Sequence, residues 1–420
     1  MLACKTVEQH PPLKAATITS TVAACAPAKS AGADLTQVPF GRPEAWQDEW
    51  RSVRNILCVR LDSMGDLLMT TPALRALKAS GPDRRITLLT SLAGAKAAAL
   101  IPEVDQVIVY EAPWMKASGR RTDSRLEFLM TARLRLAGFD AAVIFTVFSQ
   151  NPLAAALLAY LAEIPRRLAH CRENPYQLLS HWVPEQDNLA AGAIRHEVRR
   201  QLDLVAAIGC QAEDDSLSVR VPRLAARKVH NLLSEAGLKL DCPWVVIHPG
   251  ARAPSRRYSP QGFAQAAGEL VQGYGVQVVF TGSAAERELV EEIRTAMGAP
   301  SVSFAGRLDL GEFAALLEYA PLLISNNTGP VHLAAGVGTA VVDIYALTNP
   351  QHTPWGVPNR VLSHAVPCKN CFKSICPMGH HDCLRLVSPQ VVVQAALELL
   401  HETRMARLAK KPQAVERPAL

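Results

Sequence analysis

Short apolar segments alternate with amphipathic ones along most of the chain, and this alternation restricts the fold more than any other feature. From Asn55 onward, the segments NILCVRL, RITLLTS, QVIVYEA and AAVIFTV predict strands, and a segment with helical spacing of apolar residues follows each of them. Parallel strands need such a helical crossover, because the chain must return to the end of the sheet where the previous strand began. The first half of the chain therefore predicts a doubly wound parallel sheet.

The alternation restarts after a polar stretch at residues 211–224. The segments WVVIHPG, VQVVFTG, SVSFAG, LLISNNTG and AVVDIYA predict the strands of a second parallel sheet. We therefore predict an α/β protein of two facing Rossmann-like domains, at residues 53–215 and 216–403, with a ligand cleft between the carboxyl ends of the two sheets. The flanking ranges, 1–52 and 404–420, are predicted to be a disordered leader and a tail.

The composition agrees with a chain that has two apolar cores. The 420 residues are 49% hydrophobic, and no uninterrupted apolar run reaches about 18 residues, so no transmembrane segment is predicted. The N-terminal region lacks the continuous apolar stretch of a secretory signal, which favours a cytoplasmic protein. The net charge is +6 and aromatic residues make up 5%. Without a zinc-finger or RNA-binding motif, we expect no nucleic-acid partner.

Polar residues gather where the predicted strand LLIS ends and a helix begins, in the stretch SNNTGPVHLAA. Thr328 and Gly329 precede Pro330, which suits the first turn of a helix because that turn does not need its N–H group. Unpaired amides at a helix N-terminus bind phosphate groups, and His332 lies within the same turn. We predict a diphosphate site here. For His332 taken alone, a histidine satisfied within the core is the alternative.

A basic loop follows the strand WVVIH, with the sequence PGARAPSRRYSP. It contains Gly250, Arg252 and Arg256, and guanidinium groups bind phosphate oxygens in bidentate pairs. The alternative is a surface loop with solvated arginines. Glu286 follows the next strand, where it would either accept hydrogen bonds from ribose hydroxyls or favour the N-terminus of its own helix.

A third polar group lies at the end of the first predicted strand, in the sequence LDSMGDLLM. Gly65 lets the backbone turn closely, and Asp66 lies near the start of the following helix. The structural interpretation of Asp66 is a helix cap. A capping carboxylate stays ionised, which is also what a general base requires. Both interpretations of Asp66 are open at this point.

Other nucleotide-binding patterns are missing from the sequence. There is no G-x-x-x-x-G-K-[ST], so phosphoryl transfer on a P-loop is not expected. The G-x-G-x-x-G pattern is incomplete, which argues against a dehydrogenase. No D-x-D pair occurs, so a metal bridge to the diphosphate of that kind is not predicted.

Taken together, these segments resemble glycosyltransferase family 9, whose best-known members are ADP-heptose:lipopolysaccharide heptosyltransferases. The segments are SMGDLLMTTPALRALK, HPGARAPSRRYSPQGFA, TGSAAERELVEEI, FAGRLDLGEFAALLEYAPLLISNNTGPVHLAA and PWG. They occur in order between about Asn55 and Glu402. The resemblance implies a GT-B fold, an N-terminal acceptor domain and a C-terminal nucleotide-sugar domain. It also implies inversion at the anomeric carbon and no cofactor for the transfer.

The resemblance further implies roles for single residues. Asp66 matches the proposed catalytic base, which would take a proton from the acceptor hydroxyl. The acceptor-binding positions would be Ser63, Met64, Gly65, Arg120 and Arg121. The donor-binding positions would be Gly250, Arg252, Arg256, Glu286, Leu308, Asn327, Thr328, Gly329 and His332. Among these, Glu286 matches a position near the ribose and Leu308 one beside the adenine.

The chain departs from the family pattern at two places. Asn327 replaces the aspartate of a D-T-G-x-x-H motif, so an amide that can also donate stands where a carboxylate would accept hydrogen bonds from the donor sugar. Arg256 and Tyr258 replace the common lysine and tryptophan. Phosphate binding remains expected, and ADP-heptose is the leading donor.

A dense basic segment, KASGRRTDSRLEFLMTARLRLAG, contains Arg120 and Arg121 and is expected to attract an anionic partner. Most arginine doublets elsewhere are expected on solvated helix faces. The implied function is transfer of a heptose to an anionic, lipid-linked saccharide of the lipopolysaccharide core. It would take place at the cytoplasmic face of the inner membrane, with peripheral membrane contact. The alternatives are a nucleotide-sugar epimerase of the same fold and a non-catalytic nucleotide-sugar-binding protein.

The predicted loop at residues 366–385 is rich in cysteine. Its cysteines are Cys368, Cys371, Cys376 and Cys383, with the spacing C-x₂-C-x₄-C-x₆-C. This spacing favours a structural zinc or iron site, because four thiolates leave no open position for chemistry. Free thiols or a disulfide are the alternatives.

Overall fold

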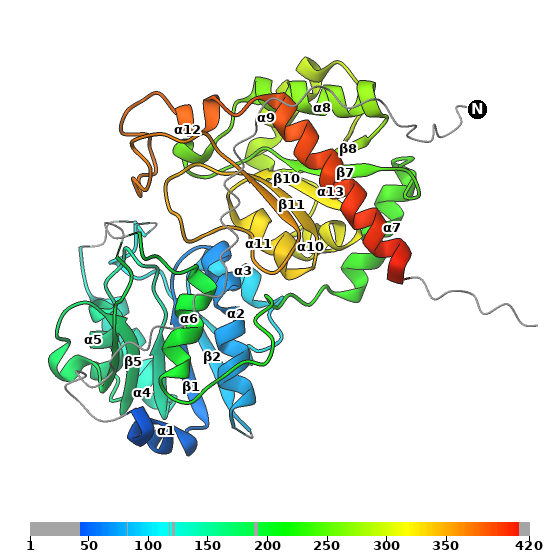
Figure 1. Cartoon of the computed structure of the whole chain (residues 1–420). Helices are drawn as coiled ribbons and strands as arrows, with labels where there is room; N and C mark the ends of the chain where they lie inside the picture. Colours follow the sequence, from blue (N-terminus) through cyan, green and yellow to red (C-terminus); the bar gives the residue numbers. More distant parts are fainter. Residues whose placement is uncertain (1–42, 82, 117, 120–121, 189–191, 411–420) are drawn as a thin grey trace, which may run out of the picture.

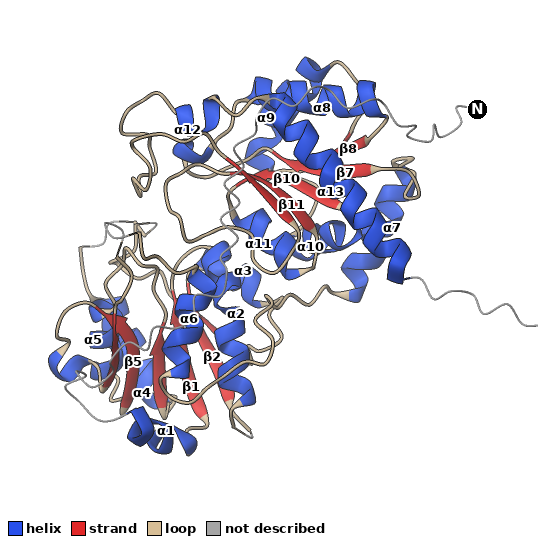
Figure 2. Ribbon diagram, in the orientation of Figure 1, coloured by secondary structure: helices blue, strands red, loops and turns tan. Residues whose placement is uncertain are grey.

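The computed structural model describes residues 43–81, 83–116, 118–119, 122–188 and 192–410. It has two lobes, and each lobe has a central sheet flanked by helices (Figures 1 and 2). The sheet of the N-terminal lobe has six parallel strands in the order β3-β2-β1-β4-β5-β6. The sheet of the C-terminal lobe has six parallel strands in the order β12-β11-β10-β7-β8-β9.

The strands and helices follow one another in regular alternation. The strands of the N-terminal lobe are β1 (Asn55–Arg60), β2 (Arg85–Thr90), β3 (Gln106–Val109), β4 (Ala141–Ile144), β5 (Arg166–Cys171) and β6 (His181–Pro184). Its helices are α1 (Pro43–Arg51), α2 (Met64–Ala79), α3 (Leu92–Ala98), α4 (Arg125–Leu136), α5 (Leu153–Leu161) and α6 (Glu197–Ala206), with a 3₁₀ turn η2 (Tyr176–Leu178).

The C-terminal lobe repeats this pattern. Its strands are β7 (Trp244–His248), β8 (Gln277–Phe280), β9 (Val302–Ser303), β10 (Leu322–Asn326), β11 (Ala340–Ile344) and β12 (Asn359–Leu362). Its helices are α7 (Arg223–Glu235), α8 (Pro260–Tyr274), α9 (Arg287–Met297), α10 (Leu310–Tyr319), α11 (Gly329–Gly336), α12 (Asp382–Arg385) and α13 (Pro389–Lys410), with 3₁₀ turns η3 (Pro254–Arg256) and η4 (Ala284–Glu286).

Both sheets have the same topology. Counted from its own first strand, each follows the order 3-2-1-4-5-6, which is the doubly wound Rossmann order. The prediction of two Rossmann-like α/β sheets is confirmed. In such a sheet a ligand binds beyond the carboxyl ends of the strands where the winding reverses. Those points lie between β1 and β4 in one lobe and between β7 and β10 in the other. The predicted boundary between the two domains, at residues 215 and 216, stays a prediction.

Apolar burial explains why these strands form and why the lobes meet. Residues 56–60 of β1 and 322–326 of β10 are all buried, which is the expected pattern for a parallel strand covered on both faces. One continuous apolar cluster joins Leu67 and Leu74 of α2 to Val331 of α11, in the other lobe. The two lobes therefore pack through α2 and α11, and this contact positions the site.

Two strands, β5 and β6, escaped the sequence analysis because they are rich in charged and aromatic residues. Arg167 of β5 is buried, and its guanidinium donates to the carbonyl oxygens of Gln177 and Leu178. The expectation that most arginine doublets are solvated is wrong for Arg167, and also for Arg84 and Arg200, which are buried. Buried guanidinium groups are tolerated here because they are hydrogen-bonded.

The predicted leader over residues 1–52 is too long. Residues Pro43–Arg51 form helix α1, and its Trp46 and Trp50 are buried in the core of the N-terminal lobe. Indole rings contribute much apolar area, so a segment that anchors two of them is ordered. The predicted tail over 404–420 is also too long, since α13 continues to Lys410. The rest of the leader and of the tail lies outside the described residues.

Candidate active site

Asp66 lies in the first turn of α2, as the sequence predicted. Ser63 is the N-cap residue, and one carboxylate oxygen of Asp66, Oδ2, accepts hydrogen bonds from the backbone N–H and the hydroxyl of Ser63, at 3.0 and 2.7 Å. The other oxygen, Oδ1, lies 3.8 Å from Arg60 and 3.9 Å from His352. The interpretation of Asp66 as a helix cap is therefore confirmed for one oxygen, while the other lies near Arg60 and His352. Its role as a general base stays a prediction.

The surroundings of Asp66 keep it ionised. Burial alone raises the pKa of its carboxyl, but His352, Arg60 and the hydrogen bonds from Ser63 outweigh burial and hold the pKa below its usual value. The neighbouring Asp62 is different, because burial raises its pKa to about 7 in spite of Arg60. Of the two carboxylates at the end of β1, Asp66 is the one available as a base throughout the neutral range.

The N-terminus of α11 has no side-chain cap. Thr328 is the N-cap residue, but its hydroxyl donates to the carbonyl oxygen of Asn326, 3.2 Å away, and no acidic residue lies in the first turn. The first amides of a helix have no partner within the helix and carry a partial positive charge. The predicted helix start is confirmed. Pro330 has no N–H group and the N–H of Val331 donates to the carbonyl oxygen of Thr328 at 3.0 Å, so only the other amides of this turn can bind an anion.

The starts of α2 and α11 are in direct contact across the lobes. A Cβ atom on Gly65 would lie 2.7 Å from Cδ2 of His332, and a Cβ atom on Gly329 would lie 2.3 Å from Cε of Met64. Both distances are shorter than van der Waals contact, so a side chain at position 65 would meet the ring of His332, and one at position 329 would push the flexible end of Met64 aside. The sequence assigned these four residues to opposite domains, and in the structure they form one junction, made of Met64, Gly65, Gly329 and His332.

His332 is buried and lies against this junction. Burial is the main cause that lowers its pKa to about 3, so the imidazole is neutral. Its Nδ1 atom is buried and has no hydrogen-bond partner among the described residues. The alternative of a satisfied core histidine is therefore wrong. A neutral ring with an open nitrogen can form a hydrogen bond with a ligand but cannot supply a positive charge.

Asn327 is held by two buried partners. Its amide Nδ2 donates to Asp343 Oδ2 at 2.7 Å and to the carbonyl oxygen of His352 at 2.8 Å. Burial raises the pKa of Asp343, on the neighbouring strand β11, to about 8. Both N–H groups of the amide are thus used within the protein. We expected Asn327 to be able to donate to a ligand; instead, only its carbonyl oxygen remains to meet one.

The basic loop after β7 also lies at the junction. Arg252 lines a cavity between the lobes, and the guanidinium groups of Arg252 and Arg256 have no hydrogen-bond or ion-pair partner within the described part of the chain. Ser255 between them is buried and binds the backbone of residues 373 and 374. Unpaired guanidinium groups on an anchored loop are suited to hold an anion.

Gly250 and Glu286, both predicted donor-binding residues, lie in contact. A Cβ atom on Gly250 would lie 2.0 Å from Oε1 of Glu286, so glycine leaves room for this carboxylate. Oε2 of Glu286 accepts from the backbone N–H of Ser283 at 2.7 Å, which caps the 3₁₀ turn η4. Tyr258 is buried, and its hydroxyl donates to the carbonyl oxygen of Val387. Leu308 is half-buried against the core.

A cavity of about 960 Å³ opens beside the junction. Asp62, Ser63 and Asp66 line it from the N-terminal lobe, and Arg252 and Phe372 line it from the C-terminal lobe. Its wall in the N-terminal lobe continues past Lys96, Trp114, Lys116 and Gln150. A cavity of this size holds a ligand larger than a monosaccharide. The predicted acceptor residues Arg120 and Arg121 lie outside the described residues.

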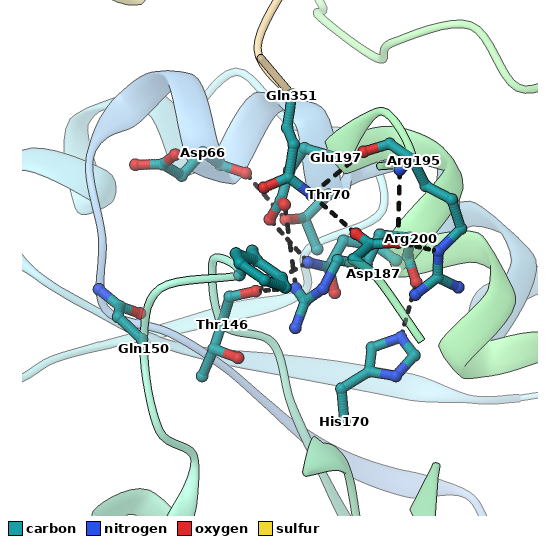
Figure 3. A network of polar contacts seen from close by, with 12 residues as sticks. Asp66, Thr70, Thr146, Gln150, His170, Asp187, Arg195, Glu197, Arg200 and Gln351 are labelled. Atoms are coloured by element: carbon teal, nitrogen blue, oxygen red, sulfur yellow. Dashed lines mark hydrogen bonds and ion pairs between the residues drawn. The ribbon is translucent and has the colours of Figure 1, made fainter. Parts of the chain in front are cut away.

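A buried polar network lies behind Asp66 (Figure 3). Arg60, at the end of β1, donates to Glu197 of α6 at 2.8 Å and also lies 3.2 Å from Asp62. Arg200 donates to Glu185 at 2.7 Å, and Glu185 lies 3.0 Å from Arg195. Such a network pairs its charged groups with one another, and this pairing fixes the orientation of its members.

The sequence analysis missed four members of the site, namely Arg60, Glu197, Gln351 and His352. Arg60 is a charged residue inside an apolar strand, and this signal could have revealed it. Gln351 and His352 follow the predicted strand AVVDIYA, so the rule for strand ends would have selected them. Glu197 gave no such signal, because it sits in a helix like many surface glutamates.

The cysteine-rich loop gathers its side chains around one small pocket. Cys368, Cys371, Cys376 and Cys383 line it together with His380 and His381. Cys368 Sγ lies 3.7 Å from Nε2 of His380. Across the described ranges, however, no three histidine, cysteine or acidic side chains are grouped closely enough to hold a metal ion. The donor types fit zinc or iron but their spacing does not, so the metal site stays a prediction.

None of the helices within the described residues is long and apolar enough to cross a membrane.

Comparison with known proteins agrees with this architecture. The crystal structure of a family 9 glycosyl transferase from Veillonella parvula superimposes with a TM-score of 0.69 at 21% identity, covering 84% of this chain and 99% of that one. The structure of Escherichia coli ADP-heptose lipopolysaccharide heptosyltransferase II gives a TM-score of 0.64 at 23% identity, covering 83% and 99%. These likenesses establish the GT-B fold.

Sequence comparison extends the likeness. Lipopolysaccharide heptosyltransferase 2 of Salmonella typhimurium is 26% identical over 357 residues, which cover 83% of this chain and 99% of the relative. The Escherichia coli K12 heptosyltransferase 2 is 25% identical over 355 residues, covering 82% and 98%. The model of glycosyltransferase family 9 (heptosyltransferase) matches residues 130–381, more than half of the chain. The chain therefore belongs to glycosyltransferase family 9.

Proposed function

We propose that the protein is an inverting glycosyltransferase that moves a heptose from ADP-heptose to an anionic, lipid-linked saccharide of the lipopolysaccharide-core type. The observation that carries this proposal is the junction of an ionised Asp66 with the uncapped N-terminus of α11. The relatives add support through their names. A fold neighbour, Escherichia coli heptosyltransferase WaaC (18% identity, TM-score 0.57), was solved with ADP-2-deoxy-2-fluoro heptose.

In the proposed reaction, Asp66 accepts the proton of an acceptor hydroxyl while that oxygen attacks the anomeric carbon. The new bond to the acceptor forms as the bond from the anomeric carbon to the diphosphate breaks, so the configuration inverts. The leaving diphosphate gains negative charge at this step. The amide end of α11, together with Arg252 and Arg256, stabilises that charge, so the proposed transfer requires no metal cofactor.

The remaining donor contacts divide by chemistry. Glu286 accepts hydrogen bonds from the ribose hydroxyls, and Leu308 contacts the adenine. Asn327 presents its carbonyl oxygen to hydroxyl groups of the sugar, since both of its N–H groups are occupied. His332 forms a neutral hydrogen bond with the donor. Gly250, Thr328 and Gly329 leave the backbone free to approach it.

The acceptor enters from the N-terminal lobe, past Ser63, Met64 and Gly65. Lys96 and Lys116 on the cavity wall, with Arg120 and Arg121 nearby in sequence, attract its anionic groups. A lipid-linked acceptor would place the protein in peripheral contact with the cytoplasmic face of the inner membrane.

We also propose that the cysteine-rich loop binds a structural zinc or iron once its four thiols close around the ion. Elemental analysis of the purified chain should find about one metal atom per molecule. A Cys371→Ser variant should lose the metal and keep donor binding, since these cysteines lie outside the junction. The proposal would be contradicted if the purified protein contained no metal and all four cysteines reacted as free thiols.

The direct test of the function is a thermal-shift panel of nucleotide sugars. ADP-heptose should raise the melting temperature more than GDP- or UDP-linked donors, because a ligand stabilises the folded state in proportion to its affinity. ADP alone should give a smaller shift. Equal shifts for all donors, or none, would remove ADP-heptose as the substrate.

A further inference from the structure

The loop between β11 and β12 crosses from the C-terminal lobe to the N-terminal lobe at Gln351. The side chain of Gln351 donates to Asp187 Oδ2 at 2.9 Å and to the carbonyl oxygen of Arg195 at 3.1 Å. The backbone carbonyl oxygen of Gln351 accepts a hydrogen bond from the backbone N–H of Glu197 at 3.0 Å. Gln351 is fully buried, and Figure 3 shows it above Glu197 and Arg195. The loop is therefore fastened at this point to the network behind Asp66.

The next residue, His352, touches both halves of the candidate site. Its carbonyl oxygen accepts from the amide of Asn327, in the donor motif, at 2.8 Å. Its ring Nε2 lies 3.9 Å from Oδ1 of Asp66 and 3.3 Å from the amide of Asn349, which orients the ring. His352 is buried, so neither contact competes with bulk water.

We propose that His352 is a positioning residue that couples Asn327 of the donor motif to Asp66, and that Gln351 holds it there by fastening its loop to the N-terminal lobe. A donor that shifts Asn327 would move the backbone of His352 and hence the ring beside the carboxylate. The assignment of Asp66 as the base rests on the proposed function, whereas the physical coupling does not.

Other charged groups also face Asp66, and the coupling must be separated from them. Arg60 reaches it from β1, and Asp62 and Glu197 lie within the same network. His332 faces it from α11. After burial, which opposes it, His352 is the largest cause of the lowered pKa of Asp66, ahead of Arg60. The pKa of His352 itself is lowered by burial, against the influence of Asp66 and Glu197.

A simpler interpretation is that the loop only holds the lobes together. Trp355, three residues further on, provides the control for it. Its indole N–H donates to the carbonyl oxygen of Asp215 at 2.8 Å, and its ring lies 4.5 Å from that of His196. These contacts also join the lobes but do not involve Asp66. A Trp355→Phe variant therefore weakens the lobe contact without touching the coupling.

The first test needs no substrate and uses a double-mutant cycle of His352→Gln and Asp66→Asn. Ionised Asp66 stabilises the folded protein at any pH above the pKa that it has in the unfolded chain. This stabilisation is lost as the pH falls through its lower pKa in the folded protein. Without His352 that folded pKa rises, so the acid limb of the unfolding curve should move to higher pH. His352 also titrates on its own account in the Asp66→Asn background, so the acid limb should move differently in the two backgrounds, and this difference measures the coupling. The same movement in both backgrounds would overturn the coupling.

The second test measures transfer from ADP-heptose to an extracted saccharide acceptor. His352→Gln should lower kcat by roughly 10- to 100-fold while KM for the donor changes less than about twofold, because misplacing a base affects the transition state more than binding. Gln351→Leu should act in the same direction, and Trp355→Phe should leave kcat within about twofold. Equal losses in Trp355→Phe and Gln351→Leu would overturn the role of Gln351. If the unaltered protein transfers nothing, the proposed function fails and the double-mutant cycle still decides the coupling.

Discussion

The helix N-termini that meet at the junction, those of α2 and α11, are built alike and behave in opposite ways. Each follows a buried parallel strand, and each depends on a glycine for its close approach to the other. At α2, the carboxylate of Asp66 caps the helix and neutralises its positive end. At α11, the hydroxyl of Thr328 turns back to Asn326 and leaves the positive end free. One start therefore carries an ionised carboxylate and the other has no acidic residue in its first turn.

Under the proposed function, the position of one acidic residue distinguishes the acceptor half of a symmetric fold from the donor half. A negative charge in the first turn excludes a diphosphate from α2, because like charges repel in a partly buried site. No acidic residue lies in the first turn of α11, which is why the proposed function assigns the donor to that helix. The two lobes share one strand order, so topology alone would not distinguish them.

The largest effect should follow removal of the base. An Asp66→Asn variant keeps the size of the side chain but cannot accept the acceptor proton, so kcat should fall by about 10²- to 10⁴-fold. Donor affinity, measured by calorimetry with ADP-heptose, should stay the same or rise slightly. Full activity in this variant would show that another group, such as Asp62, takes the proton.

The next effect should come from making α11 resemble α2. In Thr328→Asp, a carboxylate would cap the helix and raise stability by roughly 0.5–1 kcal/mol, while repelling the diphosphate and weakening ADP binding by about tenfold or more. The N-cap residue of α8 is Ser259, whose hydroxyl oxygen accepts from the backbone N–H of Gly262. Ser259→Asp is therefore a matched control. That variant should keep its ADP affinity. Equal ADP affinity in the two variants would contradict the assignment of α11 to the donor site.

A smaller and graded effect should follow from adding a methyl group on either side of the junction. Gly65→Ala meets the rigid ring of His332, whereas Gly329→Ala meets the flexible end of Met64. The free energy of unfolding should fall by about 1–3 kcal/mol for Gly65→Ala and by less for Gly329→Ala, because methionine can move aside. Chemical denaturation measures both. No loss in either variant would mean that the lobes separate in solution.

The smallest change concerns the pH dependence of stability. Burial raises the folded pKa of Asp343 to about 8, so the folded state binds a proton that the unfolded state has lost, and stability falls as pH rises toward 8. Asp343→Asn should flatten this fall by an amount on the order of 1–3 kcal/mol. Asp62, whose folded pKa is about 7, acts with the same sign at lower pH. Above about pH 7, the slope of the free energy of unfolding against pH therefore reports on Asp343 rather than on Asp62. An unchanged slope in the variant would place the proton elsewhere.

Much of the site was predictable from residues at the ends of apolar strands. Asp66, Gly250, Thr328 and Gly329 each follow such a strand, and a parallel sheet brings the carboxyl ends of its strands to one edge. The two-lobed fold was predictable for the same reason, since strand and helix alternate with clear periodicity. Strands β5 and β6 were not, because their arginines and histidines are buried by hydrogen bonds that no periodicity reveals.

The sequence by itself determined the two Rossmann sheets, the helix starts and the chemical types of the residues at the cleft, because these depend on neighbours within one strand–helix unit. Only the tertiary structure decided that His352 and Arg60 would face Asp66 and that Asn327 would use both N–H groups internally. Those contacts join residues separated by up to hundreds of positions. Their distances are set by how the lobes pack, and local sequence carries no record of that packing.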